Sequence, residues 1–368
     1  LQLFDPAVLA TNEHAEIQSA GALLLASAAP SDLKGAEDLV VSFLKSPIAE
    51  ARDAAVTAIA RLSLMDIDTA DRLADHVASV LYRKEEVPGT RDSAVQAGMT
   101  EGILASFIRK GPDQIWTMLR AKAEPARRVG AQALQSFDAE NFSLRKTARI
   151  GNNDQRMARD WAIKSLSGRL NEIEQKPEEI FALLDGDWDD SREQAYKLIR
   201  NKLDPGSWRA ETIVAFCDCI TKPAQAFGRE MLARAFSNDN AQLFLRRLSE
   251  HPSSGFRLTI ARLIREYAAN DPARMKQVEP ALRTILSRVF SSRAAKDQSF
   301  AFLNEEISRG NAANLPVVAD MLDRLSATCV VDDKARILNL IVRLKERDAD
   351  LVPHVQITPF EIRQARVN

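Results

Sequence analysis

Cysteine, glycine, proline and aromatic residues are all scarce in this sequence of 368 residues. The three cysteines, Cys217, Cys219 and Cys329, are too few for a disulfide framework, so we expect a reducing compartment, the cytoplasm. Only 14 residues are glycine and 15 are proline, and aromatic side chains make up 6%. What remains, rich in alanine, leucine, arginine and glutamate, is a composition that favours helices.

Long apolar segments are also missing. No apolar run reaches the roughly 18 residues that a membrane-spanning helix needs. The stretch from Ile17 to Ser31 is uncharged, but no lysine or arginine occurs before Lys34, so the basic region of a signal peptide is lacking. We therefore expect a soluble protein in which this stretch is a buried helix.

Catalytic and metal-binding motifs are absent from the sequence. It contains no P-loop, GxGxxG, GxSxG or HExxH pattern, and its four histidines include no pair four residues apart. Cys217 and Cys219 are two residues apart on an expected helix and would point in different directions, which disfavours a shared metal. We therefore expect no enzyme activity, no cofactor and no metal.

The sequence does contain a repeated element, in which an arginine or lysine is followed by alanine or a similar small residue and then by leucine, isoleucine or another apolar residue. Successive copies are separated by 28 to 40 residues. This drifting period is typical of a helix-turn-helix repeat. The copies start at Arg52, Arg91, Arg128, Arg159, Arg192, Arg229, Arg257, Lys296 and Arg336.

The second-helix pattern Arg-x-x-Ala-x-x-x-Leu, preceded by a polar loop such as Ser46 to Arg52, resembles the HEAT-repeat superfamily and its bacterial HEAT-like branch. The resemblance covers about residues 50 to 345. It implies an all-α fold, a right-handed α-α superhelix of HEAT-like helix pairs. We expect one solenoid of about nine pairs over 1–349, with capping helices at 1–47 and an extended C-terminal tail at 350–368.

An arginine ladder is the first candidate site. In HEAT-like arrays the arginine near the start of the second helix usually bonds an acidic or backbone oxygen of the adjoining loop. The resemblance therefore implies a structural role for Arg52, Arg192, Arg229 and Arg336, with charge-assisted hydrogen bonds contributing about 1.5–3 kcal/mol when partly buried.

A basic block is the second candidate site. Residues 1–90 carry 7 Lys+Arg against 14 Asp+Glu, whereas residues 91–170 carry 14 against 8. Two interpretations are open: a surface for an anionic partner, or a solvated helix face with ion pairs between repeats. The tryptophans nearby, Trp116 and Trp161, are interpreted as core anchors. The expected partner-binding residues are Arg120, Lys122, Arg127, Arg128, Arg145, Lys146, Arg149, Arg156 and Arg159.

Two functions follow from these observations. The first is a non-catalytic protein-interaction scaffold that binds a partner, such as an acidic protein segment, along the solenoid surface. The alternative is a nucleic-acid-binding protein that uses the block 120–159, as in HEAT-like DNA glycosylases, which the chain resembles only at the level of the fold. Lyase-like HEAT relatives leave an enzyme as a third, less favoured reading.

Overall fold

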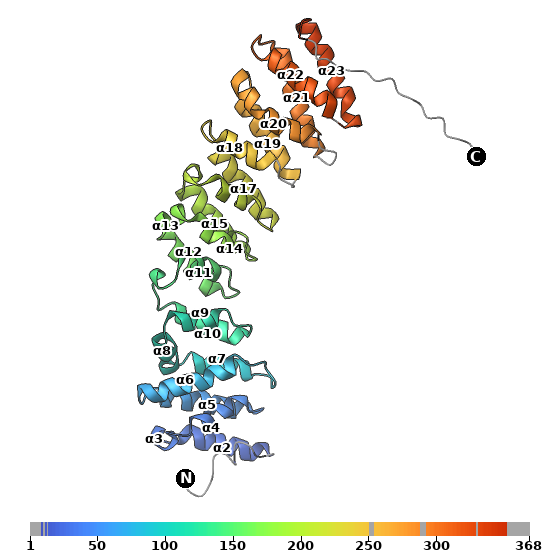
Figure 1. The fold of residues 1–368 in the computed structure, drawn as a ribbon. Helices are drawn as coiled ribbons and strands as arrows, with labels where there is room; N and C mark the ends of the chain where they lie inside the picture. Colours follow the sequence, from blue (N-terminus) through green and yellow to red (C-terminus); the bar gives the residue numbers. More distant parts are fainter. Residues whose placement is uncertain are drawn as a thin grey trace, which may run out of the picture. The chain divides into compact units, whose positions relative to one another are not determined.

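The computed structural model describes residues 9, 12, 14–249, 254–287, 292–328 and 330–351. Within these ranges all regular structure is helical, comprising α-helices α2 to α23 and four short 3-10 helices, with no strand (Figure 1). The expected all-α class of stacked helix pairs is thus confirmed. The tail expected at 350–368 lies outside the described residues from residue 352 onward.

The chain divides into two compact units, Leu1–Leu203 and Asp204–Asn368. A single continuous solenoid over 1–349, with capping helices at 1–47, stays a prediction.

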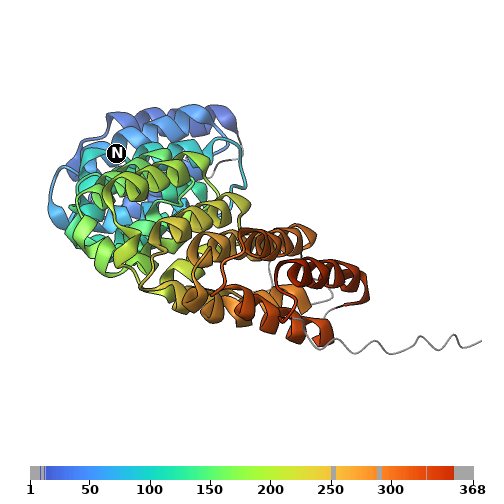
Figure 2. The same ribbon diagram turned by 90° about the horizontal axis from the view of Figure 1, so that it is seen from above.

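Unit 1 consists of two layers of helices. The A layer contains α4 (Glu37–Ser42), α6 (Ile67–Leu81), α8 (Glu101–Arg109), α9 (Pro112–Leu119), α11 (Leu144–Ile150) and α14 (Phe181–Leu184). The B layer contains α2 (Ala15–Ser27), α5 (Ala49–Leu62), α7 (Thr90–Gly98), α10 (Glu124–Leu134), α12 (Arg156–Ser167) and α15 (Asp189–Lys202). Successive B helices pack side by side, and the helices of unit 1 overlie one another in the view from above (Figure 2).

Shorter elements connect the layers of unit 1. They are α3 (Pro30–Leu33), η1 (Phe43–Lys45), η2 (Ala139–Asn141), α13 (Leu170–Gln175) and η3 (Pro177–Ile180).

Unit 2 has the same two-layer design. One layer contains α16 (Ala210–Cys217), α18 (Ala241–Ser249), α20 (Pro272–Ser287) and α22 (Leu315–Thr328). The other contains α17 (Lys222–Ala235), α19 (Ser254–Ala268), α21 (Arg293–Arg309) and α23 (Val331–Arg347), and η4 (Pro205–Ser207) precedes α16. In both layers each helix contacts the next one of its own layer and its partner in the pair.

Small residues let the paired helices approach closely. In α17, a Cβ atom on Gly228 would lie 2.5 Å from the carbonyl oxygen of Phe216 in α16. In α5, Ala51, Ala55 and Ala58 are almost fully buried. Alanine costs little side-chain entropy when it is buried, so an alanine-rich face suits a helix covered on several sides.

One edge of unit 1 carries the turns that lead from an A helix to the B helix of the same pair. These turns span residues 46–48, 82–89, 120–123, 151–155 and 185–188. Because the B helices α5, α7, α10, α12 and α15 are side-by-side neighbours and each begins at such a turn, the turns form a row. We call this row the turn edge.

Candidate functional site

The fourth residue of a B helix binds the turn in front of it. This residue is an arginine in four helices of unit 1, and its Nη1 donates to the carbonyl oxygen six residues earlier. The pairs are Arg52 to Ser46 at 2.9 Å, Arg127 to Ala121 at 2.7 Å, Arg159 to Asn153 at 3.0 Å and Arg192 to Gly186 at 2.6 Å. In unit 2, Gln225 of α17 makes the same contact with Cys219 at 2.9 Å.

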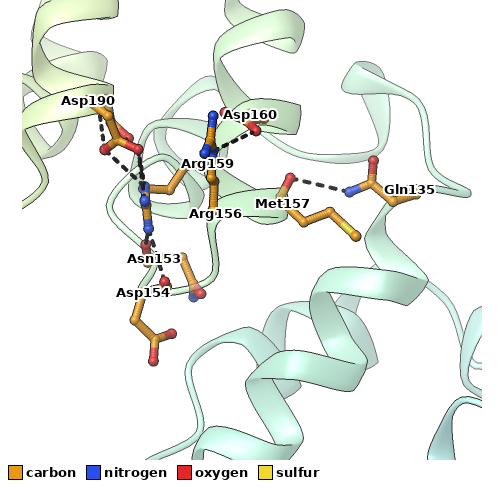
Figure 3. A network of polar contacts seen from close by, with 9 residues as sticks. Gln135, Asn153, Asp154, Arg156, Met157, Arg159, Asp160 and Asp190 are labelled. Atoms are coloured by element: carbon orange, nitrogen blue, oxygen red, sulfur yellow. Dashed lines mark hydrogen bonds and ion pairs between the residues drawn. The ribbon is translucent and has the colours of Figure 1, made fainter.

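Two of these arginines also hold the next turn along the edge. Arg127 donates from Nε and Nη2 to the Asp154 carboxylate at 2.8 and 2.6 Å. Arg159 does the same with Asp190, with Nε 3.1 Å from Oδ1 and Nη2 2.8 Å from Oδ2, as Figure 3 shows. Arg127 therefore joins its own turn to the following turn, and Arg159 joins its own turn to the start of α15.

Pairing with these arginines lowers the pKa of both carboxylates. The hydrogen bonds from Arg159 hold the pKa of Asp190 below its usual value. Burial acts to raise the pKa of Asp154, but the hydrogen bonds and charge of Arg127 outweigh it, so this pKa too is lowered. Arg159 is 7% exposed, and its guanidinium lies 4.4 Å from the ring centroid of Trp188.

Five of the nine expected partner-binding cations are bonded to carboxylates within the protein. Arg127 and Arg159 occupy the ladder position, where their donors are engaged within the protein. Arg145 of α11 donates to Glu179 of η3 at 2.8 Å, and Lys146 of α11 pairs with Asp113 of α9 at 2.9 Å. Arg156, whose side chain is 81% exposed, lies 3.6 Å from Asp160 one turn along α12 (Figure 3).

The other four members of the block are exposed and make no side-chain hydrogen bond or ion pair within the described part of the chain. Two of them lie in turn 120–123, and the other two lie in helices that adjoin turns 120–123 and 151–155. Arg120 caps the C-terminus of α9, Lys122 lies in the turn itself, Arg128 is in the first half of α10, and Arg149 is one residue from the end of α11. We call Arg120, Lys122, Arg128 and Arg149 the basic edge.

An aromatic side chain flanks the basic edge. The Arg120 guanidinium is 5.3 Å from the ring centroid of Trp116, and the Lys146 ammonium is 5.7 Å from it. Because Trp116 is half-buried, it orients Arg120 through a cation–π contact while packing against the core. Trp161 is buried, and its indole Nε1 donates to the Phe137 carbonyl at 3.1 Å.

The two ladder residues of unit 2 have other surroundings. The Arg229 guanidinium is 5.9 Å from the ring centroid of Phe256. Arg336 donates to Asp297 of α21 at 2.6 Å and lies over Phe300. The contribution of the ladder to stability stays a prediction.

Sequence reasoning did not assign Arg127 and Arg159 to the ladder. The signal was available: each is the fourth residue after a polar turn, and an aspartate follows 27 and 31 residues later.

Within the described residues, the cysteines and other ligand-type residues form no metal-binding cluster. Cys217 and Cys219 are buried, and burial raises the pKa of the Cys217 thiol. Cys329 lies outside the described residues. Across the described ranges, histidine, cysteine, aspartate and glutamate nowhere gather in threes at metal-binding distance. None of the helices described here combines the length and apolarity needed to cross a bilayer.

No protein-family model matches the sequence, and no curated protein does. Among solved structures the chain is similar to an engineered protein, with 14% identity, 92% of this chain and 98% of that chain covered, and a TM-score of 0.27. It is also similar to a structure of microtubule polymerases with TOG domain arrays that recruit tubulin, with 11% identity, 93% and 83% covered, and a TM-score of 0.32.

Proposed function

We propose that this protein is a non-catalytic interaction scaffold whose basic edge binds an acidic segment of a partner protein. The observation that carries the proposal is the division of the basic block. Five of its cations are engaged by carboxylates of unit 1, whereas Arg120, Lys122, Arg128 and Arg149 are exposed without such a partner in the described residues.

The basic edge is large enough to act as one electrostatic feature. Successive helix pairs stand about 8–10 Å apart along the stack. Cations on two successive pairs are therefore separated by about one physiological Debye length, which is roughly 8 Å. Their potentials therefore add at the surface. A carboxylate-bearing segment that crosses both turns would meet all four cations.

The pairs formed in this way are solvent-exposed, which limits their strength. Exposed ion pairs contribute about 0.2–1 kcal/mol each, so four of them give weak, salt-sensitive binding. We expect a short acidic peptide to bind with a Kd of about 1 mM or weaker at physiological salt, and at least tenfold more tightly near 20 mM salt, where screening is weak.

A fluorescence-anisotropy titration tests the proposal. The probe is a fluorescein-labelled, glutamate-rich peptide, titrated with the full chain at low salt. The variant carries Arg120→Gln, Lys122→Gln, Arg128→Gln and Arg149→Gln. The control carries Lys164→Gln, Lys176→Gln, Lys197→Gln and Lys202→Gln, which removes the same charge from exposed positions elsewhere in unit 1.

The expected result is a loss of at least tenfold in affinity for the basic-edge variant and a change under twofold for the control. Equal losses would mean that net charge alone attracts the peptide, and that result would contradict the proposal. An unchanged affinity in the basic-edge variant would contradict it as well.

The nucleic-acid alternative is an arm of the same experiment. Four phosphate contacts would give duplex DNA a slope of log affinity against log salt of about −3.6. The exposed Asp187 and Asp189 on the neighbouring turn disfavour a continuous phosphate backbone. A slope of that size, with DNA bound more tightly than the peptide, would favour the alternative.

A further inference from the structure

Three more exposed cations lie on the turn edge, outside the block singled out from the sequence. Lys45 ends η1 immediately before turn 46–48, and Arg83 and Lys84 lie in turn 82–89. All three line one groove together with Val80 and Val87. Their side chains form no hydrogen bond or ion pair among the residues that the structure describes.

The acids of this groove do not cancel the three cations. Glu85 is engaged, because its Oε1 accepts from the backbone N–H of Gly89 at 2.9 Å and its Oε2 lies 3.6 Å from Arg91 Nε. Glu86 is the exposed acid of the turn. With Lys45 from the preceding turn, the exposed charge of the groove remains positive.

Contacts place the groove in line with the basic edge. Arg52 bonds Ser46 in the first turn, and its Nη2 lies 2.6 Å from the position that a Cβ atom on Gly89 would take, so the first two turns are adjacent. Arg127 joins turns 120–123 and 151–155. Since α7 packs against both α5 and α10, its turn lies between theirs.

The exposed charge of the turn edge is negative at its last turn, 185–188. Turn 185–188 is followed directly by α15, and Asp187, Asp189 and Asp190 are exposed there. Asp190 is bound by Arg159 and Asp189 by Arg192, whereas Asp187 has no side-chain partner within the described ranges. Trp188 is 37% exposed next to it.

We propose that the first four turns form one continuous surface for an extended acidic segment, which ends with a basic residue at turn 185–188. This inference rests on the proposed function and names the form of its partner. Successive helix pairs are about 8–10 Å apart, so the distance from the first turn to the fourth is about 24–30 Å. An extended chain rises about 3.3 Å per residue, so about seven to nine residues cover the first four turns and about three more reach turn 185–188.

The layer spacing also sets the spacing of the acids. Because successive helix pairs repeat about every 10 Å along the row, an extended segment with one carboxylate in every three residues presents one acid to each pair. A helix rises only 1.5 Å per residue and would need an acid about every six or seven residues. The basic residue at the end would meet the exposed carboxylate of Asp187, where it gains charge attraction.

Labelled 12-residue peptides titrated onto the full chain test this inference. One peptide has a glutamate at every third position between serine and glycine, and a second has the same composition with its four glutamates in succession. Binding is measured to the wild type, to Lys45→Gln/Arg83→Gln/Lys84→Gln, and to a matched control, Lys164→Gln/Lys176→Gln/Lys197→Gln. Melting temperatures confirm that each variant is folded.

The spaced peptide is expected to bind at least threefold more tightly than the clustered one, and the Lys45/Arg83/Lys84 variant is expected to lose about threefold to tenfold. If this variant binds like the wild type while neutralising the basic edge still weakens binding, the continuous surface is refuted and the proposed function stands. If neither set of substitutions weakens binding, both fail.

The basic end of the partner has its own test. An arginine added to one end of the spaced peptide should raise affinity for the wild type and not for Asp187→Asn, and the end that responds gives the direction of the segment. If an arginine at neither end raises the affinity, the claim that the segment ends with a basic residue is refuted.

Discussion

Arg159 and Asp190 join two successive helix pairs of unit 1 through a two-point ion pair. The guanidinium also donates from Nη1 to the carbonyl oxygens of Asn153 and Asp154, each at 3.0 Å. One side chain therefore fixes the turn before α12 and the start of α15 relative to each other (Figure 3). Arg127 and Asp154 repeat the arrangement one pair earlier.

Replacing Arg159 with methionine is expected to destabilise the protein. The substitution removes charge-assisted hydrogen bonds from a side chain that is 8% exposed, worth about 1.5–3 kcal/mol, and the melting temperature should fall by roughly 4–10 °C. Thermal unfolding followed by circular dichroism measures the effect. Arg156→Met, three residues away with an 81% exposed side chain, is the control and should change the melting temperature by less than about 1–2 °C.

Arg192→Ala is expected to lower the melting temperature as well. Its Nη1 donates to the Gly186 carbonyl at 2.6 Å, and its side chain is 11% exposed. Removing it leaves that carbonyl without this donor and opens a gap behind turn 185–188. The loss should be somewhat smaller than for Arg159, because Asp189 is 82% exposed and regains water. A melting curve identical to that of the wild type would count against a structural ladder.

Gly228→Ala tests the close approach of α16 and α17. The new methyl group would lie 2.5 Å from the Phe216 carbonyl oxygen and 2.7 Å from the Cys217 backbone nitrogen, so the two helices would have to separate. We expect a loss of about 1–3 kcal/mol in unfolding free energy, measured by urea denaturation. Gly168→Ala is the matched control, since its methyl group would meet the Ser165 oxygen at an ordinary 3.6 Å.

Stability should decrease in acid in part because of Asp66. This residue caps α6, accepting from the Thr69 backbone N–H at 2.7 Å, and it also pairs with Lys34 at 3.0 Å. These bonds lower the pKa of Asp66 from 3.8 to about 2. Because the pKa of Asp66 is lower in the folded state than in the unfolded state, the ionised carboxylate stabilises the folded protein. This contribution is complete above about pH 4 and is lost as the pH falls toward 2.

Unfolding free energies measured between pH 5 and pH 2 check this contribution. Asp66→Asn keeps a capping side chain but cannot titrate, so its stability should depend less steeply on pH over that window than that of the wild type. Parallel pH profiles for the two proteins would show that Asp66 contributes nothing to acid sensitivity.

The helical class could be predicted from the sequence because it depends on local composition and on a short repeated pattern. The recurring arginine also indicated where B helices begin, since a donor at the fourth helical position reaches the turn behind it.

The kink that separates α8 from α9 lies at Gly111 and Pro112, where Gly111 has a φ of +90°. Glycine adopts this backbone conformation at little cost.

The division of the basic block could not be predicted from the sequence. Arg145 pairs with Glu179, and Lys146 with Asp113, at separations of 34 and 33 residues. Because the repeat length drifts, such partners cannot be aligned by counting residues. Nearby residues with the same charge, such as Arg127 and Arg128, therefore differ completely: one holds two turns together, and the other is exposed.

Paired measurements on two double variants test the central claim, that the arginines of the block that bond neighbouring turns hold the stack together while the exposed ones bind the partner. Melting temperature and affinity for the acidic peptide are measured for Arg127→Gln/Arg159→Gln and for Arg120→Gln/Arg149→Gln. We predict that the first lowers the melting temperature and, at a temperature where it is folded, binds the peptide within twofold of the wild type. The second should melt like the wild type and bind severalfold more weakly. The reverse pattern, or weaker binding in both variants to the same degree, would contradict the account.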